Sequence, residues 1–150
     1  MSLERECERL RDIPMFRDLD DAKCKLVAMS SDRLNYVPGD IVFHQDDPSD
    51  AVYFMLHGRI KVTKRRNEQD IEIAELDGGA VLGETGVICG RARSATITAI
   101  EESTMLRTDA HVFKELLQQV PQVAVALARE LANRVDATSD RLLATLYDKP

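Results

Sequence analysis

The chain contains 150 residues, of which 44% are hydrophobic and 31% are charged, and its formal net charge is −6. This composition is ordinary for one folded domain and excludes a disordered chain. An acidic chain without a concentrated stretch of lysine and arginine is not expected to bind nucleic acid on its own or an anionic membrane surface. No apolar run approaches the ~20 residues of a membrane span, and we expect no signal peptide at the charged N-terminus. The three cysteines are scattered, which favours reduced thiols and a cytoplasmic protein.

The first part of the chain, residues 1–33, is rich in charge, and its leucines recur at helical spacing. Pro14 interrupts this pattern, because proline removes a backbone donor inside a helix. We therefore expect two short helices here rather than one.

The middle of the chain has the pattern of short strands. All seven glycines lie between Gly39 and Gly90, so tight turns are concentrated there. The runs between these turns alternate apolar and polar residues and contain many β-branched side chains, over 53–56, 60–63, 71–76 and 95–100. Several short antiparallel strands of this kind predict a sandwich, a barrel or a jelly roll.

The end of the chain has the strongest helical pattern. Asp109 is suited to cap a first helix, which Pro121 then breaks or bends. Residues 122–146 contain no glycine or proline, and apolar side chains recur there every three or four residues along one face. A helix of ~25 residues is ~37 Å long, which is more than a small β domain can cover. We therefore predict a homodimer that forms through residues 122–146.

A candidate anion site begins at Gly83, between two of the strand patterns. Gly83 and Gly86 leave backbone amides accessible at the start of a short helical turn. Arg93 carries a planar fork of donors that suits two phosphate oxygens, and Ser94 adds a hydroxyl and an amide. Glu84 is an acceptor, which suits a sugar hydroxyl better than a phosphate. Together these groups indicate a nucleotide of low charge rather than a triphosphate with magnesium.

Motifs spread along the chain match those of one known family. Gly83-Glu84 is followed, nine positions after Glu84, by Arg93-Ser94-Ala95, as in that family's phosphate-binding cassette. Further matches lie on both sides: Pro38-Gly39-Asp40, Tyr53-Phe54, Gly58 and Leu76-Asp77-Gly78 upstream, and Asp109, Phe113, Leu116-Leu117, Pro121 and Leu131 downstream. The sequence resembles the cyclic nucleotide-binding domain family, and within it the catabolite gene activator group.

The resemblance implies a mainly β fold, a double-stranded β-helix or jelly roll with flanking helices and a long C-terminal helix. It implies one cyclic nucleotide-binding domain over residues 1–150. The expected parts are N-terminal helices over 1–35, a β roll over 36–108 with the cassette at 82–95, and the family's B and C helices over 109–148.

The resemblance also implies the ligand, a cyclic nucleotide, with cyclic AMP expected and cyclic GMP as the alternative. In such a complex Arg93 would neutralise the cyclic phosphate. Backbone amides from Gly83 onward, that of Thr85 among them, would complete the phosphate contacts together with Ser94.

The sugar and the base would be bound by other side chains. Glu84 would accept a hydrogen bond from the ribose 2′-hydroxyl. Thr138 and Ser139 resemble the Thr-Ser pair with which cyclic-AMP-dependent activators reach the adenine. Carried over, Thr138 would contact the base in its own subunit and Ser139 the base in the partner subunit.

The chain departs from the family pattern at a few positions. Thr85 stands where members usually have leucine, and Asp46 stands where many have glycine, although aspartate can adopt the left-handed conformation of a turn. Activators of the family continue into a helix-turn-helix domain, whereas this sequence ends at Pro150. We therefore expect the sensor part of a signal transduction protein, with a transcription regulator as the first candidate, either complete in itself or cut from a longer chain.

Two other functions stay open. A degenerate scaffold would keep the fold with an empty pocket and bind only other proteins. An enzyme of the cupin-like jelly-roll type would need clustered histidine and carboxylate metal ligands, whereas His44, His57 and His111 are isolated in the sequence. We therefore expect no metal, no cofactor and no catalytic residues.

Overall fold

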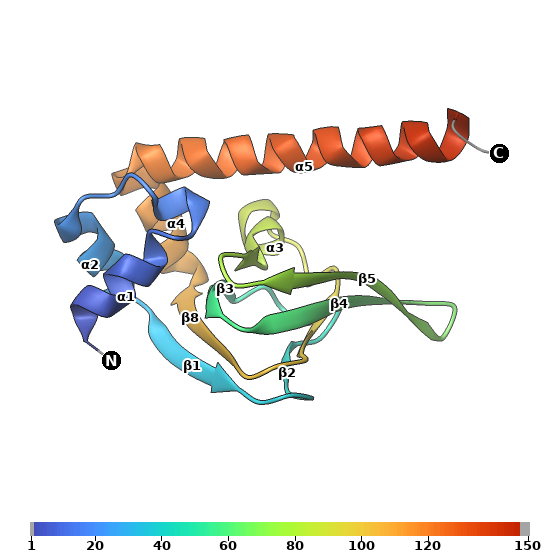
Figure 1. The fold of residues 1–150 in the computed structure, drawn as a ribbon, viewed down its shortest axis with the longest axis horizontal. Coiled ribbons are helices and arrows are strands. Elements are labelled where there is room, and N and C mark those ends of the chain that lie inside the picture. The colour runs from blue at the N-terminus through green and yellow to red at the C-terminus, as the bar shows by residue number, and fades with distance from the viewer. Residues whose placement is uncertain (1, 148–150) are drawn as a thin grey trace.

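The computed structural model describes residues 2–147, and Figure 1 shows a β roll with short helices at one end and a long helix lying across it. The N-terminal elements are α1 (Leu3–Leu10), the 3₁₀ helix η1 (Pro14–Phe16) and α2 (Asp21–Met29). The two helices predicted here are confirmed, and each begins at a side-chain cap. Ser2 accepts a hydrogen bond from the Arg5 amide at 3.3 Å, and Asp20 accepts one from the Lys23 amide at 2.9 Å.

Two antiparallel sheets of four strands each form the roll, in the orders β1-β8-β3-β6 and β2-β7-β4-β5. The strands are β1 (Asp32–Tyr36), β2 (Ile41–Phe43), β3 (Ala51–His57), β4 (Arg59–Arg66), β5 (Gln69–Asp77), β6 (Val81–Leu82), β7 (Thr96–Ala99) and β8 (Ser103–Asp109). This arrangement confirms the predicted jelly roll. The first strand begins before residue 36, because Asp32 already pairs with Arg107 of β8.

Strand β3 separates two hydrophobic clusters, because successive side chains of a strand point to opposite faces. Val52 and Phe54 belong to the cluster under the helices, while Tyr53 and Met55 belong to the cluster inside the roll. Phe54 lies against two aromatic rings of the helical layer, Phe16 at 4.9 Å and Phe113 at 6.1 Å between ring centroids. The strand therefore fixes the position of the helices relative to the roll.

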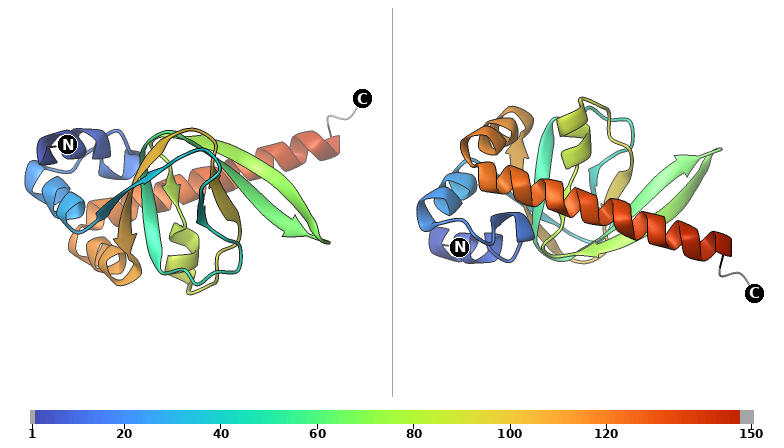
Figure 2. Two further views of the ribbon diagram at one scale, coloured as in Figure 1. Left: turned by 90° about the horizontal axis from the view of Figure 1, so that it is seen from below. Right: turned by 90° about the horizontal axis from the view of Figure 1, so that it is seen from above.

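The remaining helices lie in the second half of the chain. The first of them belongs to the cassette, and the other two form the C-terminal part. These helices are α3 (Glu84–Cys89), α4 (Ala110–Gln119) and α5 (Pro121–Tyr147). The predicted break at Pro121 is confirmed, since proline suits the first position of a helix and starts α5 there. Val123 and Leu127 of α5 are buried, whereas the helix continues past the roll with its later turns exposed (Figure 2). Over residues 2–147, no helix has the length and apolarity needed to cross a membrane.

The turn between β3 and β4 requires a glycine. Gly58 has φ of +114°, and a Cβ atom at this position would lie 2.5 Å from the Ser103 Cα. The Arg59 amide next to it donates to the Ser103 hydroxyl at 3.2 Å, so β4 begins in close contact with the start of β8. This close approach holds the two sheets together at one end of the roll.

We expect Gly58→Ala to destabilise the fold more than Gly39→Ala. Both glycines have positive φ, but a Cβ at Gly39 would meet no atom within 4 Å. The difference isolates the clash with Ser103, which we expect to lower the free energy of unfolding by about 2 kcal/mol beyond the shared backbone cost. Urea denaturation of both variants measures this difference, and equal losses would contradict the close contact.

Candidate ligand-binding site

A cavity of about 690 Å³ lies between the β roll, α3 and α5. Such a volume is within the range of roughly 300–1,000 Å³ found for small-molecule sites. Its lining includes most of the residues that the sequence predicted to bind ligand: Gly83, Glu84, Thr85, Arg93, Ser94 and Thr138. Apolar side chains of the roll form much of the remaining wall, among them Val62, Ile73, Leu76, Leu82 and Ile97. The lining of the cavity therefore combines charged side chains, such as Glu84 and Arg93, with an apolar surface.

Ser139 does not line this cavity and is exposed on α5. The sequence analysis assigned Ser139 to the base bound in the partner subunit, and this role stays a prediction. Thr138, one residue before it, lines the cavity of its own chain, and its contact with a base stays a prediction.

The cassette is shaped by a glycine at the start of α3. Gly83 is the N-cap of α3 with φ of +80°, which is the left-handed conformation that favours glycine. A Cβ at this position would lie only 2.2 Å from Nη1 of Arg93. Gly83 is therefore the residue that lets the guanidinium of Arg93 lie directly against the backbone at the start of the helix.

The side chain of Arg93 is buried and is held mainly by neutral groups. Nη2 donates to the Ala51 carbonyl at 2.6 Å and Nη1 donates to the Gly83 carbonyl at 3.1 Å. The guanidinium carbon lies 4.1 Å from the centroid of the Phe43 ring, which is a cation–π contact. One carboxylate, that of Asp50, lies within 3.4 Å of Nη2.

The hydrogen-bonding capacity of Arg93 is not exhausted by these contacts. Its Nε is buried and has no hydrogen-bond partner among residues 2–147. Burial lowers the pKa of Arg93, while Tyr53 and Asp50 act in the opposite direction. The guanidinium stays charged at neutral pH, because the ordinary pKa of an arginine lies far above neutrality. A buried cation with an unpaired donor is a good site for an anion.

Glu84, the carboxylate of the cassette, is 3% exposed and pairs with α5. Its Oε1 accepts from Nη1 of Arg134 at 2.5 Å. Nη2 of the same arginine donates to Glu130, one turn earlier on the helix, at 3.0 Å. An ion pair therefore joins the cassette to the long helix.

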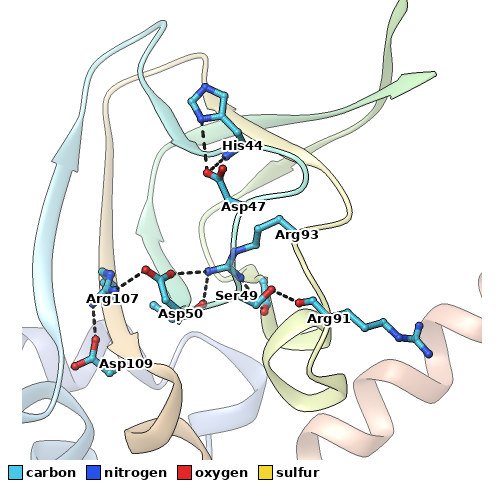
Figure 3. Close-up of polar contacts among 10 residues, drawn as sticks. His44, Asp47, Ser49, Asp50, Arg91, Arg93, Arg107 and Asp109 are labelled. Carbon is cyan, nitrogen blue, oxygen red and sulfur yellow. Dashed lines mark hydrogen bonds and ion pairs between the residues drawn. The ribbon is translucent and has the colours of Figure 1, made fainter. Parts of the chain in front are cut away.

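The loop between β2 and β3 lies against the cassette beside Arg93 (Figure 3). The Asp46 amide donates to the Arg93 carbonyl, and the Arg93 amide donates to the Asp47 carbonyl, both at 2.8 Å. Asp46 has φ of +74°, so it takes the left-handed conformation that the sequence allowed for it. The Ser49 hydroxyl donates to the Arg91 carbonyl at 2.6 Å. These bonds fix the backbone from which Arg93 reaches the cavity.

The family model described as "Cyclic nucleotide-binding domain" matches residues 33–120. The chain belongs to the cyclic nucleotide-binding domain family. The matched residues contain the β roll and the whole cassette, so the resemblance read from Gly83, Glu84 and Arg93 is confirmed at the level of the family.

Several known proteins are similar to this cyclic nucleotide-binding domain. An uncharacterized NTE family protein of Mycobacterium tuberculosis is 29% identical over 123 residues, which cover 82% of this chain and 21% of that protein. The catabolite activator protein of Thermus thermophilus superposes with a TM-score of 0.78 at 27% identity, covering 86% of this chain and 61% of that one. The N-terminal domain of a transcriptional regulator from Streptomyces coelicolor A3(2) gives 0.69 at 29% identity, covering 88% and 95%. The chain thus spans about a fifth of the curated relative and most of the Streptomyces domain.

The structure adds residues to the site that the sequence analysis missed. Arg134 and Arg141 line the cavity from α5, on either side of Thr138 in the sequence. Their spacings of four and three residues from Thr138 place them on one face of a helix, which is the pattern that could have revealed them. Asp50 was missed because nothing in the sequence places it beside Arg93, which is 43 positions away.

We expect Arg134→Met to destabilise this cyclic nucleotide-binding domain, because it leaves the buried Glu84 carboxylate without its cation. Since Arg134 is itself about half exposed, we expect a loss of about 2 kcal/mol in the free energy of unfolding rather than the larger values of fully buried pairs. Chemical denaturation measures the loss. Arg129→Met is the matched control on the same helix, and the double variant Glu84→Gln/Arg134→Met should recover part of the stability. Equal effects of the two arginine variants would contradict a structural role for the pair.

Proposed function

We propose that this chain is a regulatory module that binds a cyclic nucleotide, with cyclic AMP as the first candidate and cyclic GMP as the alternative. The observation that supports it most directly is the guanidinium of Arg93, buried beside a cavity with its Nε unpaired. A single such cation suits the single negative charge of a cyclic phosphodiester. Gly83, Thr85 and the exposed Ser94 line the same cavity, and their amides and the Ser94 hydroxyl would complete the phosphate contacts.

The ribose would be bound by Glu84. Its Oε1 already accepts from Arg134, but a carboxylate has room for several donors, so a 2′-hydroxyl can bind without breaking that pair. The base would lie against the apolar wall of the roll, with Thr138 on α5 supplying a hydroxyl.

The ligand would act on the rest of the protein through α5. Glu84 and Arg134 join the cassette to this helix, so a ligand that engages Glu84 favours one position of the helix over others. A conformational change of this kind needs a ligand that binds one position more tightly than the other. The proposal contains no catalytic step, and within residues 2–147 there is no cluster of histidine, cysteine or carboxylate side chains able to hold a metal ion.

The relatives suggest the setting in which such a module works. One similar structure is a catabolite activator protein and another is a domain of a transcriptional regulator. We therefore propose the sensor part of a transcription regulator. The match to an NTE family protein, of which the chain spans only 21%, supports a module that also occurs within larger proteins.

Calorimetric titration with cyclic AMP and with cyclic GMP tests the binding. We expect Arg93→Met to weaken the affinity about a hundredfold, because the phosphate loses its only buried cation. Arg91→Met is the matched control, since it removes an exposed arginine from the same loop. A ligand that binds only the folded protein also raises its melting temperature, which gives a second measurement.

The parent protein should show both heat and a thermal shift with at least one nucleotide. Neither effect at millimolar concentrations of both would contradict the proposal and favour the scaffold function instead.

We also propose a homodimer that forms through α5. Val135, Leu142 and Leu146 are 65%, 57% and 55% exposed, although they recur at helical spacing on one helix. We expect sedimentation velocity to show a dimer at tens of micromolar and Leu142→Glu to shift it toward monomer. Gln118→Glu on α4 adds the same single negative charge at an exposed position and serves as the control. A monomeric parent protein, with and without nucleotide, would contradict the dimer.

A further inference from the structure

The carboxylate of Asp50 lies between two arginines, as Figure 3 shows. Its Oδ1 is 3.4 Å from Nη2 of Arg93, and its Oδ2 is 3.4 Å from Nη2 of Arg107. Charge-assisted contacts between nitrogen and oxygen are usually about 2.7–2.9 Å long. The carboxylate is therefore shared between the two cations and forms a short ion pair with neither of them.

Arg107 is held in place independently of Asp50. It lies on β8 opposite Tyr53 of β3, and its Nη1 is 2.6 Å from Asp109. Asp109 is the N-cap residue of α4, but its side chain makes no capping hydrogen bond. The first amide of α4, that of Ala110, donates instead to the Asp50 carbonyl at 2.9 Å. Arg107 is thus a fixed cation on the opposite side of Asp50 from Arg93 (Figure 3).

Arg93 has little else that would cancel its charge. Its two short contacts are to the neutral carbonyls of Ala51 and Gly83, and Asp50 is the one carboxylate with which it forms an ion pair in the described part of the chain. The side chain of Asp50 is 66% exposed, so small rotations of it are possible without disturbing the core. How closely Asp50 approaches Arg93 therefore decides how much positive charge Arg93 presents to an anion.

We infer that Arg107 is a positioning residue for phosphate binding: it holds the Asp50 carboxylate away from Arg93 and so keeps the charge of Arg93 available to the ligand. This inference rests on the proposed function. Without Arg107, Asp50 would be free to rotate and form a close ion pair with Arg93. That pair would compete with the phosphate for the same guanidinium.

A double-mutant cycle separates this role from a general loss of positive charge. We expect Arg107→Met to weaken binding of the cyclic nucleotide about tenfold and Asp50→Asn alone to strengthen it about threefold. The double variant Asp50→Asn/Arg107→Met should bind within about threefold of the parent, because no carboxylate remains to close on Arg93. Arg107→Lys keeps a cation at the position and should lose less affinity than the Met variant.

Arg59→Met is the matched control, because Arg59 also pairs with two carboxylates, Glu75 and Asp77, and its loss changes the net charge equally. It should leave the affinity within about twofold of the parent. An equal loss of affinity from Arg107→Met with and without Asp50→Asn would show only the general electrostatic effect of removing a positive charge, and would overturn the inference. An unchanged affinity in Arg107→Met would overturn it too.

The side-chain N–H resonances of Arg93 in the unliganded protein give a readout that does not depend on nucleotide binding. Arg107→Met should shift these resonances in the parent background but not in the Asp50→Asn background. If the parent binds neither cyclic nucleotide, the proposed function fails, and the resonances alone decide the role of Arg107. Resonances that do not respond to Arg107→Met, or that respond equally in both backgrounds, overturn it.

Discussion

The burial of one guanidinium inside the β roll is the constraint on which the rest of this site depends. Removing a charge from water carries a large free-energy cost unless polar groups replace the water. The chain meets this requirement for Arg93 with two backbone carbonyls, an aromatic face and a carboxylate at 3.4 Å that is shared with a second arginine. Each of these groups leaves the cation charged, so the fold stabilises the arginine without neutralising it. The positive φ of Gly83 is what brings the backbone close enough for this to work.

The two buried charged groups of the cassette have partners in different parts of the molecule. Arg93 donates hydrogen bonds to Asp50, in the loop before β3, and to Ala51, at the start of that strand. Glu84 pairs with Arg134 on α5, which comes from the end of the chain. A ligand that contacts both charges would therefore be linked to the rigid roll through Arg93 and to the long helix through Glu84. Under the function proposed above, this division would link a small molecule in the cavity to a helix whose later turns lie beyond the roll.

The sequence predicted the fold and the cassette because both depend on local patterns. Alternating runs and clustered glycines predict a sandwich, a barrel or a jelly roll. The resemblance to one family, carried by the spacing from Gly83-Glu84 to Arg93 and by further motifs along the chain, selects the jelly roll and identifies the cassette. The partners of these residues could not be predicted in the same way. Whether Asp50 lies beside Arg93, or Arg134 beside Glu84, depends on strand register and on the path of α5, which spacing along the chain does not reveal.

The two faces of β3 have a consequence for how this domain loses its structure. Phe54 lies in the cluster shared with the N-terminal helices and Met55 in the cluster inside the roll, yet they are neighbours on one strand. Neither cluster can disorder without pulling that strand away from the other. The helices and the roll should therefore melt in a single cooperative transition, and material with an ordered roll beneath disordered helices should not accumulate.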